Sequence, residues 1–335
     1  MVGKTQQTPL GQLFMVGFPG AEPPAPFLQF LAEDAIGGVI LFEENCPSHQ
    51  QTRQNIERLR QASRSPHLLV AIDQEGGRVS RLRGAPAEFR SAGDYAREKN
   101  GLEHFKEEYR RSAVYMESLG INLNLAPVAD IYLNNKNSVL RGRCYGSTPE
   151  EVTSFVRAAV DISAHSGLLS CLKHFPGLGS AELDPHVATP HVVFNEIVWS
   201  MREMAPFAAG IEAGADLVMT THVVLEPLDR TIVTGSSRII SELLRSRAAF
   251  DGPVITDDLL MEGAAVLGNV GERAVKAFLA GHDILLFGRD YDAAMSAHDD
   301  FEEAYQRGEI SPELVATALD RVAGMKYKLR RTVIG

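Results

Sequence analysis

The segment KHFPGLGSAELDPHVATP, residues 173–190, gathers ionisable side chains in a stretch without helix or strand periodicity. Its proline and glycine residues are incompatible with a helix, so we expect a loop. Lys173 and His174 open the segment, and Asp184 and His186 follow near its end. A loop of this composition in an enzyme-sized chain could hold a polar substrate and transfer a proton.

Asp184 and His186 are spaced to form a catalytic dyad. In an extended segment, residues i and i+2 point to the same side, so the Asp184 carboxylate can hydrogen-bond one nitrogen of the His186 ring. Pro185 disfavours the α conformation for Asp184 and thereby favours the extended one. The second ring nitrogen would then face a substrate, as in catalytic triads. Taken alone, the same pattern also fits a loop aspartate that caps its own backbone beside an exposed histidine.

A second carboxylate candidate stands at the end of the apolar run GPVITDD, residues 252–258. A carboxylate such as Asp257 at the end of a buried strand can attack a carbon that bears a good leaving group. Hydrolysis of a sugar acetal needs such a carboxylate together with a proton donor for the leaving oxygen. Asp257 with the Asp184–His186 pair would supply both.

Other chemistries have no matching pattern. His186 and His191 are five residues apart, His174 and His222 are scattered, and H-E-x-x-H and zinc-type cysteine spacings are absent from the sequence. FPGLGS is not a P-loop, EGG is not a dinucleotide fingerprint, and no G-x-S-x-G elbow occurs. We therefore expect neither a metal ion nor a cofactor.

The composition is that of an ordinary globular protein. The chain has 335 residues, of which 44% are hydrophobic and 23% charged, and its formal net charge is −10. This acidity and the lack of a Lys/Arg stripe argue against nucleic acid as a partner. The three cysteines, Cys46, Cys144 and Cys171, indicate reduced thiols. We expect a cytoplasmic monomer without a signal peptide or a membrane span.

Strand and helix patterns alternate along the whole chain. The apolar runs that predict strands cover residues 13–18, 37–42, 68–73, 121–128, 168–174, 216–223, 252–258 and 282–288. Helical patterns include residues 51–64, 102–119, 148–166, 196–213, 237–248 and 271–280, and Thr148 with Glu151 forms a capping box. Eight strands separated by helices favour a single (β/α)8 barrel domain over residues 1–335, with a doubly wound open sheet as the alternative.

Polar residues follow most of these strands. They are Asp73, Asp130, Lys173, His174, His222, Asp257, Asp258 and Arg289. In a barrel, these positions lie at the carboxyl-terminal rim, where active sites are built.

The sequence resembles glycoside hydrolase family 3, and in particular its single-domain bacterial β-N-acetylglucosaminidases. The motifs that carry the resemblance are AIDQEGGRVSRL (71–82), NLAPVADI (124–131), GRCYG (142–146), KHFPGLGSAELDPH (173–186) and VITDDLLMEGA (254–264). The similarity covers about residues 10 to 290. Two positions depart from the family pattern: Leu178 stands where His is usual, and Pro185 where Ser is usual.

The resemblance implies roles for individual residues. Asp257 matches the catalytic nucleophile, and His186 matches the general acid/base on a loop at about residues 175–190, with Asp184 as its partner. Further residues match those that bind the hydroxyls and the N-acetyl group of the sugar: Asp73, Arg143, Lys173 and His174.

The implied function is a retaining exo-β-N-acetylglucosaminidase (β-hexosaminidase) that needs no cofactor. Its implied substrate is a GlcNAc–anhydro-muramyl peptide, which places the enzyme in peptidoglycan recycling. The alternatives are a β-glucosidase or a GlcNAc phosphorylase on the same scaffold, and a non-catalytic sugar-binding protein. The presence of both Asp257 and His186 argues against the last of these.

Overall fold

A computed structural model describes residues 8–33, 36–65, 67–84, 86–181, 189–192, 196–226 and 228–331. Within these residues, eight parallel strands form one sheet in the order β11-β9-β7-β6-β3-β2-β1-β12. The strands are β1 (Phe14–Val16), β2 (Gly38–Leu41), β3 (Leu69–Ile72), β6 (Leu123–Asn124), β7 (Leu169–Phe175), β9 (Leu217–Thr220), β11 (Val254–Ile255) and β12 (Leu285–Phe287). Each of them falls within a predicted run, except that β7 extends one residue beyond the run at 168–174.

The two ends of this sheet meet, which decides between a barrel and an open sheet. Ile255 of β11 forms a parallel bridge with Ile284, the residue before β12. The amide of Asp283 donates to the carbonyl of Val254 over 2.8 Å. The sheet therefore closes into a (β/α)8 barrel, and the predicted fold class is confirmed.

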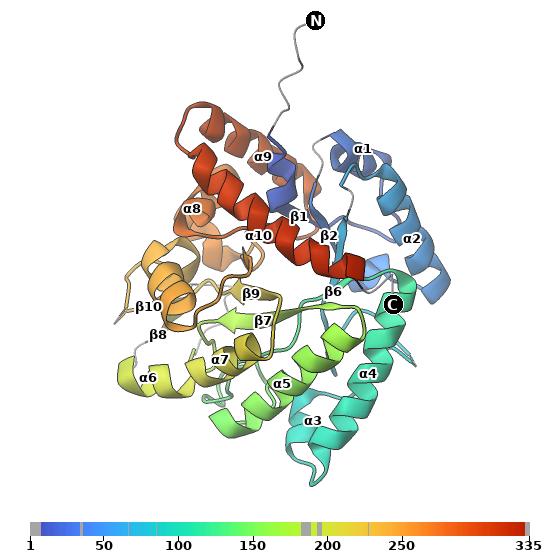
Figure 1. Cartoon of the computed structure of the whole chain (residues 1–335), viewed down its shortest axis with the longest axis vertical. Helices are drawn as coiled ribbons and strands as arrows, with labels where there is room; N and C mark the ends of the chain where they lie inside the picture. Colours follow the sequence, from blue (N-terminus) through green and yellow to red (C-terminus); the bar gives the residue numbers. More distant parts are fainter. Residues whose placement is uncertain are drawn as a thin grey trace, which may run out of the picture.

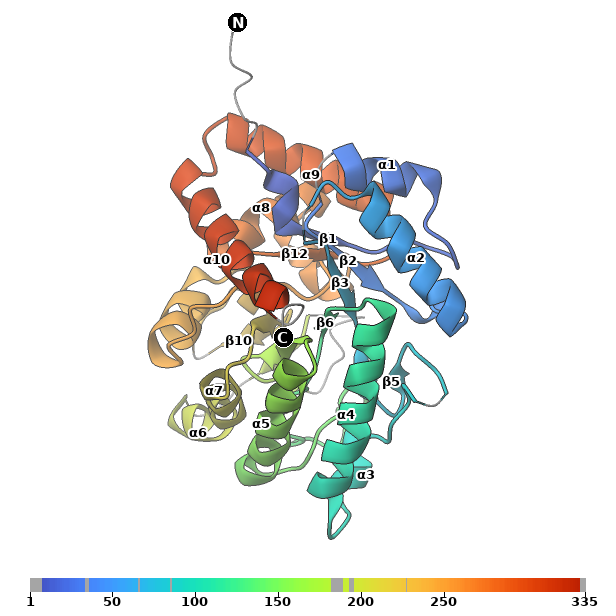
Figure 2. The ribbon, with the colours of Figure 1, turned by 45° about the vertical axis from the view of Figure 1, so that its right-hand side comes forward.

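Helices surround the barrel on its outer side (Figures 1 and 2). They are α1 (Ala25–Glu33), α2 (His49–Ala62), α3 (Ala92–Ala96), α4 (Gly101–Leu119), α5 (Pro149–His165), α6 (Glu196–Arg202), α7 (Met204–Glu212), α8 (Val270–Ala280), α9 (Tyr291–Gln306) and α10 (Pro312–Arg331). Short 3-10 helices cover η1 (Leu10–Leu13), η2 (Glu43–Asn45), η3 (Val233–Gly235) and η5 (Glu262–Leu267). Two small ribbons pair β4 (Gln74–Gly76) with β5 (Val79–Ser80) and β8 (His191–Val192) with β10 (Val224–Leu225).

Local sequence signals explain where several helices begin or break. Thr148 and Glu151 form the predicted capping box at the start of α5. The single helix predicted over residues 196–213 is instead α6 followed by α7. Pro206 lies in the first turn of α7 and has no N–H to donate to the carbonyl of Arg202, so the α6 ladder cannot continue through it. The helix predicted over 237–248 is a π-helix, η4 (Ile239–Arg247).

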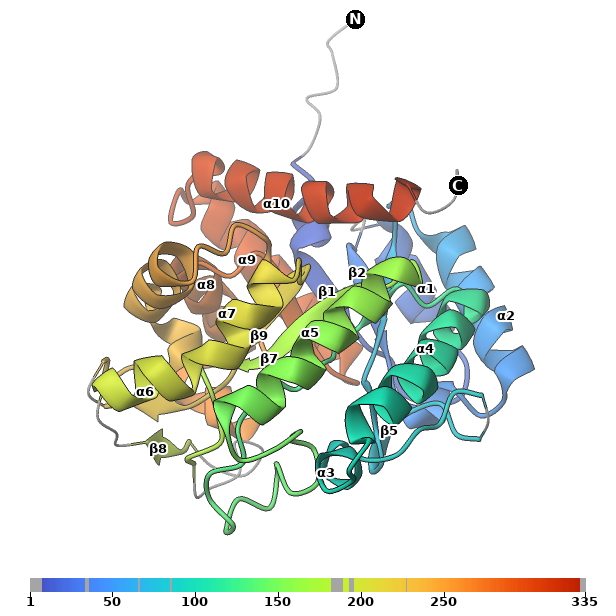
Figure 3. The ribbon, with the colours of Figure 1, turned by 60° about the horizontal axis from the view of Figure 1, so that its bottom comes forward.

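The strands bury both of their faces, as expected for a parallel barrel. Met15 belongs to the cluster inside the barrel, whereas its neighbours Phe14 and Val16 belong to the cluster between the barrel and the helices. Helix α10 lies across the amino-terminal end of the barrel (Figure 3) and contributes Val322 and Met325 to the interior cluster.

Helix α10 also places a buried ammonium at this end of the barrel. Lys326 Nζ donates to Gln12 Oε1 and to the Gly37 carbonyl, each over 2.9 Å, and to Ser65 Oγ over 3.4 Å. Burial lowers the pKa of Lys326 to about 7, and the three acceptors favour its charged form. The base of the barrel is thus closed, and the opposite rim is left for function. Among the described residues, no helix is long and apolar enough to cross a membrane.

Candidate active site

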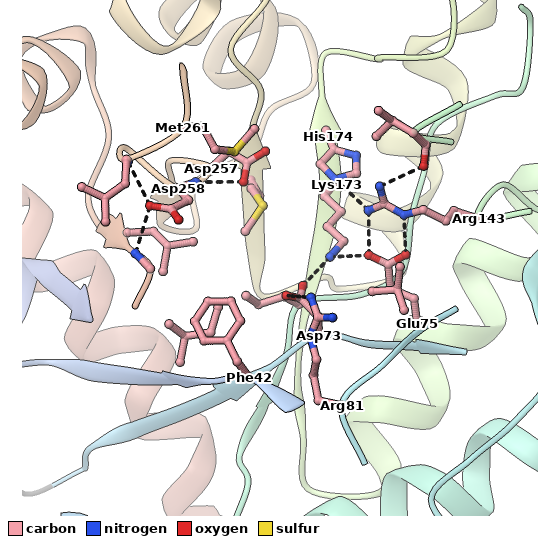
Figure 4. A pocket seen from close by; sticks show the side chains of 18 of the residues that line it. Phe42, Asp73, Glu75, Arg81, Arg143, Lys173, His174, Asp257, Asp258 and Met261 are labelled. Carbon is pink, nitrogen blue, oxygen red and sulfur yellow. Dashed lines mark hydrogen bonds and ion pairs between the residues drawn. The ribbon is translucent and has the colours of Figure 1, made fainter. Parts of the chain in front are cut away.

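A cavity of about 640 Å³ opens at the carboxyl-terminal rim of the barrel (Figure 4). This volume lies within the range of small-molecule sites. The predicted residues Asp73, Arg143, Lys173, His174 and Asp257 all line it. Residues from distant parts of the sequence are therefore brought to one place, as strand ends are in a barrel.

One wall of the cavity is a buried network of charges. Lys173 Nζ, near the end of β7, lies 2.7 Å from Asp73 Oδ1 and 2.6 Å from Glu75 Oε1. The Arg143 guanidinium binds Glu75 with two hydrogen bonds of 2.8 Å. Arg81 adds a 3.3 Å contact to Asp73 Oδ2 from the open side. Because cations and carboxylates alternate in this network, each charge has a neighbour of opposite sign.

This network determines the ionisation of its members. Burial alone would raise the pKa of both Asp73 and Glu75. Lys173 and Arg81 outweigh it at Asp73, and Arg143 and Lys173 outweigh it at Glu75, so the pKa of each carboxyl lies below its usual range. Burial would lower the pKa of Lys173, whereas Asp73 and Glu75 raise it above the ordinary value. The cluster therefore stays fully charged around neutral pH.

His174 is fixed from both sides of its ring. Nδ1 lies 2.6 Å from Asp130 Oδ2, and because a carboxylate can only accept, Nδ1 donates. Arg143 Nη2 approaches Nε2 at 3.2 Å, and since a guanidinium can only donate, Nε2 accepts. The ring is held as the neutral tautomer with both nitrogens engaged. Asp130 also accepts from the amides of His174 and Leu178, over 3.1 and 2.6 Å.

Asp257 lies on the opposite side of the cavity from this network (Figure 4). Its Oδ1 accepts a 2.8 Å hydrogen bond from the amide of Asp258. The Asp258 carboxylate instead binds the amides of Leu260 and Gly288, over 3.0 and 2.9 Å. A Cβ on Gly288 would meet Asp258 Oδ2 at 2.3 Å, so glycine is required there. Asp257 thus has the more open carboxylate of the two.

Two of the polar residues predicted at the rim lie behind the wall of the cavity instead. Asp130 and His222 are fully buried and do not line the cavity. Asp130 holds His174, and His222 Nε2 donates to the carbonyl of Asp258 over 3.0 Å. A polar residue that follows a strand can point into the pocket or support a residue that does, and sequence position alone does not distinguish the two.

Asp184 and His186 lie outside the described residues, as do residues 182–188 of the loop predicted at about 175–190. Glu75 is a site residue that the sequence reasoning missed. Its position two residues after Asp73 in DQEGG placed it on the same side of an extended segment, which is the signal that could have found it. Among the described residues, no group of three or more His, Cys, Asp or Glu side chains could hold a metal ion.

The fold and the cavity define a (β/α)8-barrel protein with a carboxylate-rich pocket suited to a polar small molecule. Residues 5–325 match the glycosyl hydrolase family 3 N terminal domain. A β-hexosaminidase of Vibrio cholerae is 35% identical over 281 residues, which are 84% of this chain and 83% of that one. A β-hexosaminidase of Xanthomonas campestris is 33% identical over 317 residues, 93% of this chain and 88% of the relative.

Solved structures agree with these relatives. A family 3 β-N-acetylglucosaminidase from Paenibacillus superposes with a TM-score of 0.92 at 34% identity, over 98% of this chain and 63% of that longer chain. A β-N-acetylhexosaminidase from Beutenbergia cavernae superposes with a TM-score of 0.88 at 30% identity, over 95% and 97% of the two chains. The chain belongs to glycoside hydrolase family 3. It is a glycoside hydrolase of the β-N-acetylhexosaminidase type.

Proposed function

We propose that this protein is a retaining exo-β-N-acetylglucosaminidase that releases terminal GlcNAc from muropeptides through a covalent glycosyl-enzyme intermediate. The observation that carries the proposal is the shared cavity in which Asp257 faces the charged network around Lys173. A pocket at the rim of a barrel with a closed base suits removal of a sugar from a chain end.

The charged network is the proposed binding wall for the sugar. Asp73, Arg143, Lys173 and His174 would bind its hydroxyls and its N-acetyl group. Hydroxyl groups both donate and accept hydrogen bonds, so a wall that alternates cations and carboxylates can satisfy several of them at once. Glu75 orients Lys173 and Arg143 by hydrogen bonds to both.

Asp257 is the proposed nucleophile. Its carboxylate attacks the anomeric carbon while the bond from that carbon to the leaving oxygen breaks, and His186 donates a proton to that oxygen. In the second step His186 removes a proton from water, which attacks the anomeric carbon and releases Asp257. Two displacements at the same carbon retain its configuration.

The assignment of His186 as the acid/base draws support from the histidine that the cavity does contain. Both ring nitrogens of His174 are engaged, by Asp130 and by Arg143, so that ring has no free position for a proton transfer. The acid/base must then come from another residue, and the match to the family pattern assigns it to His186. Asp184 would orient that ring, and Leu178, which lines the cavity, would influence the choice of leaving group.

The proposal includes the cytoplasm as the site of action and a monomer as the active form. Free cysteines suit a reducing compartment, and Cys46, Cys144 and Cys171 are all unpaired thiols. Intracellular muropeptides would be the substrates that such an enzyme meets.

A panel of p-nitrophenyl β-glycosides tests the activity. We expect GlcNAc to be released far faster than Glc, GalNAc or xylose, and a 2-deoxy-2-fluoro sugar with a good leaving group to label Asp257. Asp257→Asn should abolish turnover, whereas Asp290→Asn should not, because Asp290 caps α9 and Asn caps equally well.

Each alternative has its own outcome in this test. A preference for glucosides would favour the β-glucosidase, and GlcNAc-1-phosphate formed at millimolar phosphate would favour the phosphorylase. A label on Asp258 or Asp73 would reject Asp257 as nucleophile. Sugar binding without any turnover would leave a non-catalytic binding protein.

A further inference from the structure

The mouth of the cavity carries an arginine stacked on an aromatic ring. Phe42 follows β2 directly, and Arg289 comes two residues after the end of β12. The guanidinium carbon of Arg289 lies 4.6 Å from the centroid of the Phe42 ring. A cation held over an aromatic face in this way has a preferred position before any ligand arrives.

Arg289 differs from the other arginines that line this cavity in the described part of the chain. Arg78 donates to the carbonyls of Ser138 and Val139. Arg81 binds Asp73, and its side chain is only 24% exposed. Arg143 binds Glu75 with two hydrogen bonds. These three guanidinium groups already have strong acceptors.

The Arg289 side chain is 54% exposed, and its Nε lies 3.6 Å from Glu44 Oε1. That distance is too long for a strong hydrogen bond, and Arg289 makes no hydrogen bond with another side chain or carbonyl among the described residues. The carboxylate of the adjacent Asp290 accepts from the amide of Ala293 at the start of α9 and forms no ion pair with Arg289 among the described residues. Arg289 is therefore a preoriented cation with open donors at the mouth.

The position of Arg289 relative to Asp257 indicates what it would meet. The amide of Gly288, the preceding residue, binds the carboxylate of Asp258, which follows Asp257. Arg289 is thus anchored beside the turn that carries the nucleophile, whereas the binding wall around Lys173 lies across the cavity (Figure 4). On the proposed mechanism Asp257 attacks the face of the anomeric carbon opposite the leaving group. Because the terminal sugar lies inside the pocket against the binding wall, the leaving group projects towards the mouth, where the exposed Arg289 lies.

We propose that Arg289, held on Phe42, forms the subsite for the leaving group and selects one that bears a carboxylate close to the glycosidic bond. This inference rests on the proposed function and adds the residues that recognise the second half of the substrate. A guanidinium binds a carboxylate through two parallel hydrogen bonds, which adds geometric selectivity to the charge attraction. The weak contact with Glu44 is exchanged for the stronger one with the ligand.

The test compares two disaccharides that differ only in charge. One is GlcNAc β-1,4-linked to N-acetylmuramic acid with its free lactyl carboxylate, and the other is the corresponding primary amide. We expect the wild type to favour the acid by about tenfold in kcat/KM, as for a charge-assisted hydrogen bond at an exposed site. This ratio should fall towards one in Arg289→Gln and should shrink as salt is raised.

Two further variants complete the test. Arg289→Lys should keep part of the preference, because it retains the charge without the bidentate geometry. Arg307→Gln, a change of an exposed arginine on the C-terminal side of α9, should leave the acid-to-amide ratio unaltered. A preference for the acid that survives in Arg289→Gln would overturn the subsite.

The outcomes separate the two proposals. Equal rates for acid and amide in the wild type would reject the subsite and leave the β-N-acetylglucosaminidase activity standing. No turnover of either disaccharide or of p-nitrophenyl GlcNAc would reject the proposed function, and the subsite with it.

Discussion

The ring of His222 holds the main chain of the residue next to Asp257. Nε2 lies 3.0 Å from the carbonyl oxygen of Asp258 and must donate to it, while Nδ1 lies 2.7 Å from the hydroxyl of Thr234. The amide of the same Asp258 donates to Asp257 Oδ1. A buried side chain from the end of β9 therefore holds the main chain of the residue whose amide orients the proposed nucleophile.

His222→Phe should impair catalysis through the main chain of Asp258. We expect kcat for p-nitrophenyl GlcNAc to fall by about 10- to 100-fold with a smaller change in KM, because a slight misplacement of a reacting group is costly.

Thr234→Val is the matched control for this change, since it removes only the second partner of the ring. Its effect on kcat should be several-fold smaller. A His222→Phe variant that melts earlier but keeps the kcat of the wild type would show that the ring stabilises the fold without positioning Asp257.

Glu75→Gln should lower both stability and substrate affinity. The Glu75 side chain is 4% exposed and bridges Lys173 and Arg143, so loss of its charge leaves two buried cations less well compensated. We expect the free energy of unfolding to fall by about 3 kcal/mol, measured by urea titration, and KM to rise. Glu103→Gln, which breaks an exposed pair with Lys106, should cost less than about 1 kcal/mol. Equal costs for the two changes would contradict the buried bridge.

Acid should change the stability of the wild type and of the Glu75→Gln variant to different extents. Burial would raise the pKa of Glu75, but Arg143 and Lys173 hold it below the ordinary value of 4.5. The unfolded chain therefore takes up the proton first as the pH falls, and protonation favours unfolding. The stability that Glu75 contributes is complete above about pH 4.5 and is lost on further acidification.

We therefore expect the difference in unfolding free energy between wild type and Glu75→Gln to shrink between pH 5 and pH 3. Lys173 titrates at the other extreme, because its pKa is raised above 10.5 and its contribution is lost only as the pH rises through that higher value. Between pH 5 and pH 9 the charged network should not titrate, so the pH profile of kcat/KM in that range reports other groups. A difference that widened on acidification would exclude this account.

The Asp184–His186 dyad predicted from the sequence leads to a separate prediction about leaving groups. His186→Ala should slow the cleavage of an alkyl glycoside by roughly 10²- to 10⁴-fold, because a poor leaving group depends on protonation. The loss should be much smaller for p-nitrophenyl GlcNAc, whose leaving group needs little help. Asp184→Ala should show the same pattern to a lesser degree. His165→Ala on the exposed side of α5 serves as control, and equal losses on both substrates would exclude an acid role for His186.

Much of the fold was predictable because its signals are local. Each predicted strand run contains a barrel strand, since buried parallel strands appear as apolar runs bounded by breakers. The run at 121–128 was too long, because only Leu123–Asn124 is a strand. Pro127 has no amide hydrogen, and the pairing with β7 beyond it is an isolated bridge between Val128 and Lys173. The break between α6 and α7 was missed because an apolar period continued through Pro206.

The site was less predictable because its geometry depends on contacts between distant residues. Asp73, Arg143 and Lys173 meet in one cavity, as strand-end positions and the family pattern predict. The hydrogen bonds that make His222 and Asp130 supports for the site join residues 36 and 44 positions apart, and no local pattern encodes them. Local sequence likewise does not show that Arg289 has donors open to a ligand, because this depends on which residues bind the other arginines of the cavity.

Lys326 has a consequence for how the molecule forms and comes apart. Its ammonium binds Gln12 across 314 positions of sequence, so the base of the barrel is completed only when segments near both ends of the described chain have come together. Contacts of such long range are expensive to form early, and folding is slow where they dominate. If α10 docks after the transition state for folding, then weakening it will accelerate unfolding while leaving the folding rate nearly unchanged. Helix α10 would then set the lifetime of the native protein, independently of the rate at which the opposite end of the barrel turns over its substrate.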